Sequence, residues 1–157
     1  MSKVPVYAFS SESLEHIERA YKIQEWAVPE PTNYAAIEGK ARQMPRGSRG
    51  VFYCADVLLD QHFLTVPFRV TDTPDFPRMR DSAWPGFVLP FKFEPLGAPS
   101  KRLYRHQIAE FLSESVPDNN WHHILLVAPT TLFEPSLIES NEWNRLLERL
   151  AEHPREQ

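Results

Sequence analysis

The segment from residue 25 to residue 54 carries side chains suited to binding a planar or anionic group. Trp26 ends a short apolar run just before a proline-rich loop, a basic turn runs from Arg46 to Arg49, and Phe52 and Tyr53 lie in an apolar run after it. An indole ring can stack on a flat heterocycle, and guanidinium groups bind phosphates. The segment raises the question of which ligand such a combination would hold.

Catalytic signatures do not stand out in the sequence. The histidines lack a metal-ligand spacing such as H-E-x-x-H, and neither a glycine-rich phosphate loop nor a recognisable Ser, His and Asp set is present. Cys54 is the only cysteine, which excludes an intrachain disulfide framework, and a buried thiol is favoured over a nucleophile. A nuclease interpretation of Glu38 to Lys40 lacks a preceding acidic residue on a strand. We therefore expect no enzymatic activity, no metal and no cofactor.

Charge is distributed unevenly along the chain. The formal net charge of −4 argues against a general-purpose nucleic-acid binder. However, residues 40–105 contain eleven Lys or Arg against six Asp or Glu, whereas residues 106–157 contain three against nine. The basic middle fits a local anion-binding face, and ordinary solvated surface explains it equally well.

Long apolar runs are absent. The longest candidates, around residues 124–127 and 88–93, fall far short of the roughly 18 residues that a membrane span requires. The N-terminal residues lack the apolar region of a signal peptide. We expect a soluble, cytoplasmic protein with no membrane partner, whose 157 residues form one domain.

Hydrophobic periodicity predicts a mixed α+β chain. We expect strands at 4–9, 51–55, 63–73, 88–94 and 123–128, a short extended piece at Trp26, and helices starting near residues 14, 34, 104 and 140. Ser10 or Ser11 is placed to cap the first helix, Asn33 the second and Ser140 the last. Pro67 suggests an edge or a bulge in the 63–73 strand. Five or six such strands with short crossovers predict a small curled sheet or open barrel with helices packed on it.

The order of these motifs resembles the EVE domain and, more distantly, the YTH domain, both of the PUA-like superfamily. The resemblance rests on an aromatic first strand, a tryptophan followed by a small residue and valine, an N-Y helix start, a basic turn with glycine, an F-Y strand and a later tryptophan before a P-[FY]-[RK]-F strand. In this chain the matching positions are Tyr7 and Phe9, Trp26-Ala27-Val28, Asn33-Tyr34, Arg46-Gly47, Phe52-Tyr53, Trp84-Pro85 and Pro90-Phe91-Lys92-Phe93. It covers about residues 4–112, and residues 117–157, an expected strand and helix extension, have no counterpart.

The resemblance implies an open β-barrel with a pocket for one nucleotide base, often a methylated one, flipped out of a strand or duplex. The residues that we assign to this base pocket are Ser10, Ser11, Trp26, Ala27, Tyr53, Asp81, Trp84 and Phe91, with Phe87 as a further wall candidate. Trp26 is expected to be half exposed at the end of its strand, with a core position as the alternative. Phe91 fits the core as well, Ser10 and Ser11 fit simple capping, and Asp81 fits a turn.

Cations around such a pocket would hold the flanking phosphates. The candidates are Lys40, Arg42, Arg46, Arg49, Arg78, Arg80, Lys101 and Arg102. We expect a DNA or RNA partner carrying a modified base. The rival interpretation is a non-catalytic protein-interaction module that uses the acidic C-terminal helix, and a small-molecule pocket is a third. The oligomeric state stays open.

Overall fold

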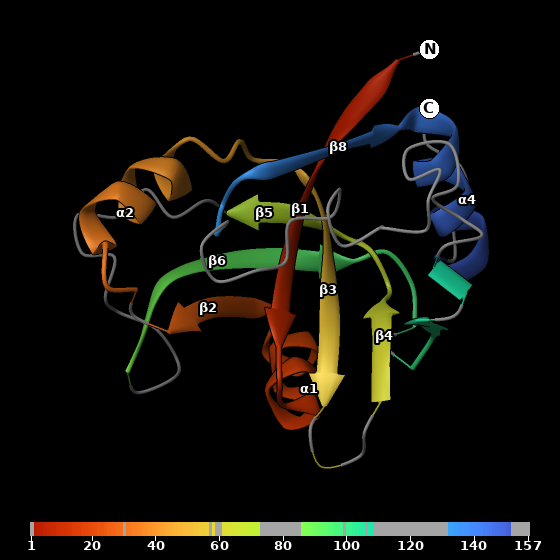
Figure 1. Cartoon of the computed structure of the whole chain (residues 1–157), viewed down its shortest axis with the longest axis horizontal. Coiled ribbons are helices and arrows are strands. Elements are labelled where there is room, and N and C mark those ends of the chain that lie inside the picture. The colour runs from red at the N-terminus through yellow and green to blue at the C-terminus, as the bar shows by residue number, and fades with distance from the viewer. Residues whose placement is uncertain are drawn as a thin grey trace.

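The computed structural model describes residues 2–29, 31–56, 58, 61–72, 86–98, 100–105, 107–108 and 132–151. In chain order (Figure 1), its elements are β1 (Lys3–Ser11), α1 (Leu14–Ile23), β2 (Glu25–Pro29), α2 (Tyr34–Arg42), β3 (Arg49–Asp56), β4 (Gln61–Thr65), β5 (Phe68–Asp72), β6 (Phe87–Pro95), β7 (Arg102–Tyr104), β8 (Pro135–Glu139) and α4 (Ser140–Leu150). None of the helices in these ranges is long and apolar enough to cross a membrane.

The described strands form one mixed sheet. Its main path runs β2-β6-β5-β3-β1-β8, and β4 extends from β3 to pair with β7. β1 and β3 are parallel, and the other pairs are antiparallel. Figure 1 shows β2, β6 and β5 running across the direction of β1, β3 and β4, so the sheet is strongly curled. This open, curled α+β sheet confirms the predicted fold class.

The two faces of the central strands bury two different clusters because successive side chains of a strand point to opposite sides. On β3, Phe52 and Cys54 join the cluster that includes residues of α1 and α2, whereas Val51 and Tyr53 join the cluster that includes the apolar face of α4. The first cluster is rich in aromatic rings. It includes Trp26 and underlies the candidate functional site.

The predicted strand 63–73 is in fact two strands. β4 ends at Thr65 and β5 begins at Phe68, and the break falls at Val66 and Pro67. Proline cannot donate a ladder hydrogen bond, and the carbonyl of the preceding Val66 accepts a hydrogen bond of 2.8 Å from the buried Tyr21 hydroxyl. The chain therefore turns from the β4–β7 edge toward β6 at this point.

Two of the predicted helix caps are wrong. Ser13 caps α1, and its Oγ accepts from the His16 backbone N–H at 3.2 Å; Ser10 and Ser11 belong to β1. Residue 139 precedes the first turn of α4, so Ser140 is its first helical residue. Asn33 does precede α2, but its side chain makes no capping hydrogen bond there.

Two strands, β7 and β8, were not expected at their positions. β8 pairs with β1 and gives the sheet its outer strand in the described part of the chain. Tyr104, expected to begin a helix, ends β7, and its backbone N–H donates to Gln107 Oε1 at 2.9 Å. The strand predicted at 123–128 and most of the helix predicted after Tyr104 lie outside the described residues.

Candidate functional site

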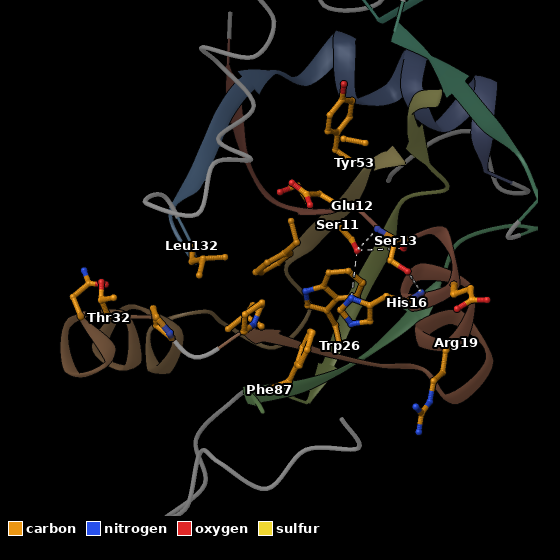
Figure 2. Close-up of a pocket in the computed structure, with 18 residues that line it drawn as sticks. Ser11, Glu12, Ser13, His16, Arg19, Trp26, Thr32, Tyr53, Phe87 and Leu132 are labelled. Carbon is orange, nitrogen blue, oxygen red and sulfur yellow. Dashed lines mark hydrogen bonds between the residues drawn. The ribbon is translucent and has the colours of Figure 1, made fainter. Parts of the chain in front are cut away.

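A pocket of about 1290 Å³ opens where β1 ends and α1 begins, beside β2 and the start of β6 (Figure 2). Three kinds of side chain line it: aromatic rings, short hydroxyl or amide side chains, and a few charged groups. The described lining residues are Phe9, Ser10, Ser11, Glu12, Ser13, Glu15, His16, Arg19, Trp26, Val28, Pro29, Pro31, Thr32, Asn33, Tyr53, Ala55, Phe87 and Leu132.

Trp26 lines this pocket but is not half exposed as predicted, because only 1% of it is accessible to solvent. The His16 imidazole stacks on the indole, with ring centroids 4.3 Å apart and planes 10° from parallel. Phe52, which does not line the pocket, lies 4.2 Å from the indole with a 30° tilt. The indole is thus held between a pocket-side ring and a core-side ring, with the hollow beside it.

The first turn of α1 fixes His16 over Trp26. Ser13 caps the His16 backbone N–H, and the Leu14 N–H donates to Asp56 Oδ2 at 3.1 Å, which ties the start of α1 to the end of β3. Ser11 Oγ lies 3.4 Å from His16 Nδ1. Phe87 meets the imidazole edge-on at 4.9 Å and 85°. Figure 2 shows these aromatic side chains gathered on one wall of the pocket.

α1 and β2 follow each other so closely because Gln24 ends the helix in the left-handed region, with φ 56°. Its backbone N–H caps the Ala20 carbonyl, and β2 starts at the next residue. A left-handed residue at this position ends the helix and redirects the chain within one residue. It places the Trp26 ring directly beneath the first turns of α1.

His16 makes the stability of the protein sensitive to acid. Burial, aided by the charge of Arg19, lowers the pKa of His16 from 6.5 to about 4. Between these values the unfolded chain binds the proton and the folded chain does not, so the stability gained from neutral His16 is complete above pH 6.5 and is lost as the pH falls toward 4. Because the ring is only partly buried, we expect about 1–2 kcal/mol less stability at pH 4.5 than at pH 7 from this residue.

Urea denaturation at the two pH values measures this loss, and His16→Phe is its control. Phenylalanine keeps a flat ring over Trp26 but cannot bind a proton. Other effects of acid on the chain are common to both proteins, so the difference between their losses of stability reports residue 16. Equal losses in the two proteins would contradict the assignment of a low pKa to His16.

The other predicted pocket residues are distributed over the pocket and the core. Ser10 and Ser11 line the pocket, and Ser11 Oγ also accepts from the Ser13 backbone N–H at 3.1 Å. Tyr53 lines it too, but its ring points away from Trp26 (Figure 2), and its hydroxyl lies 3.0 Å from His62 Nδ1. Ala27 and Phe91 are fully buried in the aromatic cluster and are not among the lining residues. Asp81 and Trp84 lie outside the described residues.

The predicted phosphate-binding cations do not line the pocket. Three of them form ion pairs: Lys40 with Glu134, Arg42 with Glu38 at 3.0 Å, and Arg46 with Asp72 at 3.6 Å. The Arg102 guanidinium stacks over the Phe63 ring at 4.5 Å. Arg49 lies on β3, Lys101 is exposed just before β7, and Arg78 and Arg80 lie outside the described residues. Among the described lining residues the cation is Arg19, which the sequence analysis did not single out.

α1 and the residues just before it supply several lining residues that were not predicted from the sequence. His16 and Arg19 are three residues apart, which places them on one side of α1, next to the buried Ile17 and Ala20, and Glu12 lies just before the helix. That spacing was visible in the sequence. Nothing local, however, indicated that this side of α1 would face the Trp26 ring.

No protein-family model and no curated protein matches the chain. Solved structures do. The apo YTH domain of Toxoplasma CPSF4 matches with a TM-score of 0.56 and 10% identity, over 98% of this chain and 92% of that one. The YTH domain of Zygosaccharomyces rouxii MRB1, in complex with N6-methyladenosine RNA, matches with a TM-score of 0.52 and 14% identity, over 92% and 85%.

Human THYN1 in complex with DNA containing 5-methylcytosine also matches, with a TM-score of 0.51 and 12% identity, over 94% of this chain and 96% of that one. Identities this low establish similarity of fold and not of ligand. The matches extend over nearly the whole chain, including the C-terminal part that the sequence resemblance did not reach. They confirm the expected resemblance in fold: the chain has the open, curled fold of these YTH domains and of human THYN1.

Proposed function

We propose that the protein binds nucleic acid and receives one flipped, modified base in the pocket at the start of α1. The observation that carries the proposal is the aromatic wall of that pocket, in which His16, Trp26 and Phe87 lie together at stacking and edge-to-face distances. Two solved structures of the same fold hold N6-methyladenosine RNA and 5-methylcytosine DNA, which supports a base as the ligand.

The dimensions of the pocket suit this use. At about 1290 Å³ it exceeds the roughly 300–1,000 Å³ of common small-molecule sites, so a base can enter with its sugar still attached to a strand. Extruding a base costs a few kcal/mol, and aromatic contact returns about 1–3 kcal/mol. The exchange is nearly balanced, so small additional contacts decide which base is held.

Two kinds of contact can decide in favour of a modified base. A methyl group packed on aromatic carbon adds about 0.8 kcal/mol, a several-fold preference. Hydrogen bonds to a base edge discriminate more strongly, because a mismatched edge leaves buried polar groups unpaired. The lining offers Ser10, Ser11, Thr32 and Asn33 for this role.

The charge near the pocket limits the contribution of phosphates. Glu12 and Glu15 accompany Arg19 in the lining, and Lys40, Arg42 and Arg46 are already paired with carboxylates. Among the described residues, Arg19 is the cation in the lining, and the three paired cations would have to leave their carboxylate partners to bind phosphate. We propose that the base contributes more to affinity than the backbone does, so the salt dependence should be shallow.

A binding screen tests the proposal. Twelve-nucleotide DNA and RNA strands, each with one 5-methylcytosine, one N6-methyladenine or the unmodified base, are titrated by fluorescence anisotropy. We expect one modified strand to bind several-fold more tightly than its unmodified counterpart. Phe87→Ala should weaken that binding about tenfold by removing an aromatic contact of the pocket.

Leu137→Ala is the matched control, because Leu137 is an exposed apolar residue on β8 that does not line the pocket. Its affinity should equal that of the unaltered protein. Tight binding that Phe87→Ala leaves unchanged would remove the pocket from the proposal. Absence of binding to every strand would reject the nucleic-acid function and favour the rival protein-interaction module.

A further inference from the structure

The indole nitrogen of Trp26 is a buried donor at the edge of the pocket. Trp26 is 1% exposed, and its Nε1 has no hydrogen-bond partner among the residues that the structure describes. Figure 2 shows this nitrogen on the side of the ring away from His16, directed toward the part of the pocket where Leu132 and Thr32 lie. Trp26 lines the pocket, and its N–H group lies covered at the pocket wall, on the edge of the indole.

The flat surfaces of the same ring are already occupied. His16 stacks at 4.3 Å on the pocket side, and Phe52 lies at 4.2 Å on the core side. A base that enters without moving His16 cannot stack on Trp26. The group that Trp26 can offer to such a ligand is its N–H.

A buried donor without an acceptor destabilises the free protein, so a ligand that supplies the acceptor recovers that loss. Burial alone does not identify a binding group, since Trp143 Nε1 is also buried without a described partner. Trp143, however, packs in the cluster beneath α4 and does not line the pocket. Position at the pocket distinguishes Trp26 from Trp143.

We propose that Trp26 recognises the ligand through its edge, donating a hydrogen bond from Nε1 to a carbonyl oxygen or an unprotonated ring nitrogen of the bound heterocycle. This inference rests on the proposed function and specifies the chemistry of the site. Trp26 is then a specificity-determining residue that selects for an acceptor. His16 and Phe87 provide the aromatic contact.

Two matched substitutions test the role of the N–H. Trp26→Phe keeps an apolar ring between His16 and Phe52 and removes the donor, whereas Trp143→Phe makes the same chemical change away from the pocket. With the strand that binds best in the screen above, we expect Trp26→Phe to weaken binding about tenfold and Trp143→Phe to change it less than twofold. Urea denaturation of both variants shows whether the fold is retained.

Equal affinity of Trp26→Phe and the unaltered protein would overturn the inference while leaving the proposed function intact. Equal losses in the two variants would also overturn it, because they would report a general effect of tryptophan replacement. Proton–nitrogen NMR of the indole groups adds a direct readout. The Trp26 resonance, identified by its absence in Trp26→Phe, should move downfield on binding, and that of Trp143 should not.

If no strand binds, the same spectrum separates the two hypotheses. The unaltered protein is then titrated with millimolar 5-methylcytidine and N6-methyladenosine as free nucleosides. A shift confined to the Trp26 resonance would support edge recognition of a small heterocycle although the nucleic-acid function had failed. An unmoved resonance would overturn the inference.

Discussion

Replacement of Gly50 by alanine is expected to destabilise the protein by about 3 kcal/mol or more. Gly50 lies opposite Phe68 in the antiparallel pair of β3 and β5. A Cβ atom at position 50 would lie 2.2 Å from Cε1 and Cζ of the Phe68 ring, a distance that real structures do not contain. The ring has no room to retreat, because it is fully buried and stacks on Phe52 at 4.5 Å.

Urea denaturation measures this effect, and Gly39→Ala is its control. Gly39 lies in α2 with no atom within 4 Å of the added methyl group, so alanine should stabilise that helix by about 0.5–1 kcal/mol. The double variant Gly50→Ala, Phe68→Leu should recover part of the loss, because leucine lacks the ring atoms that clash. Unchanged stability of Gly50→Ala would show that β3 and β5 do not pair as described.

The central strands were predictable because their signal is local. The segments around Val4 to Phe9 and Val51 to Ala55 were expected to be strands, and β1 and β3 contain them with one or two residues added at each end. For Pro67 the sequence predicted an edge or a bulge within one strand, and not a break between two strands. The partner that accommodates the break, Tyr21, lies on α1, and sequence periodicity carries no information on such distant pairs.

The candidate site was predicted only in part, because local signals indicate single residues and not the distant residues that they contact. Ser11 was predicted to lie near the pocket from its position at the start of the first helix, and Trp26 from its position at a strand end; both line it. The prediction that Trp26 is half exposed was wrong, because His16, ten residues earlier, stacks on the indole. That contact depends on the left-handed conformation of Gln24, which the sequence did not predict.

Charge was the property least accessible from sequence. Lys40 and Arg42 were counted as free cations, although Lys40 pairs with Glu134, far along the chain, and Arg42 with Glu38 one turn away. The second pair follows the i,i+4 rule and could have been anticipated, whereas the first required the fold. A count of charges along the sequence therefore could not show that Lys40 has a carboxylate partner.

Replacement of Trp26 by alanine is expected to destabilise the protein by about 3–5 kcal/mol, the range for truncation of a large buried aromatic residue. The indole lies between His16 and Phe52 and 6.4 Å from Phe9, so its removal leaves rings on both sides without contact. Although Trp26 lies beside a pocket, the loss of stability should be as large as for a core residue, because only 1% of Trp26 is exposed in the folded protein. Urea denaturation should show the midpoint falling with an unchanged slope.

His16→Ala is the matched comparison, because it removes the pocket-side ring and leaves the contact of Trp26 with Phe52. His16→Ala should lower the free energy of unfolding clearly less than Trp26→Ala does. His16 is only partly buried, and the space left by its ring is open to water. Equal stability of Trp26→Ala and the unaltered protein would contradict the buried position of the indole. If the large loss is found, weak ligand binding by Trp26→Ala carries no information on recognition, because partial unfolding alone would produce it. The hydrogen-bonding role of Trp26 can then be decided only with Trp26→Phe, in which an aromatic ring still fills the space between His16 and Phe52.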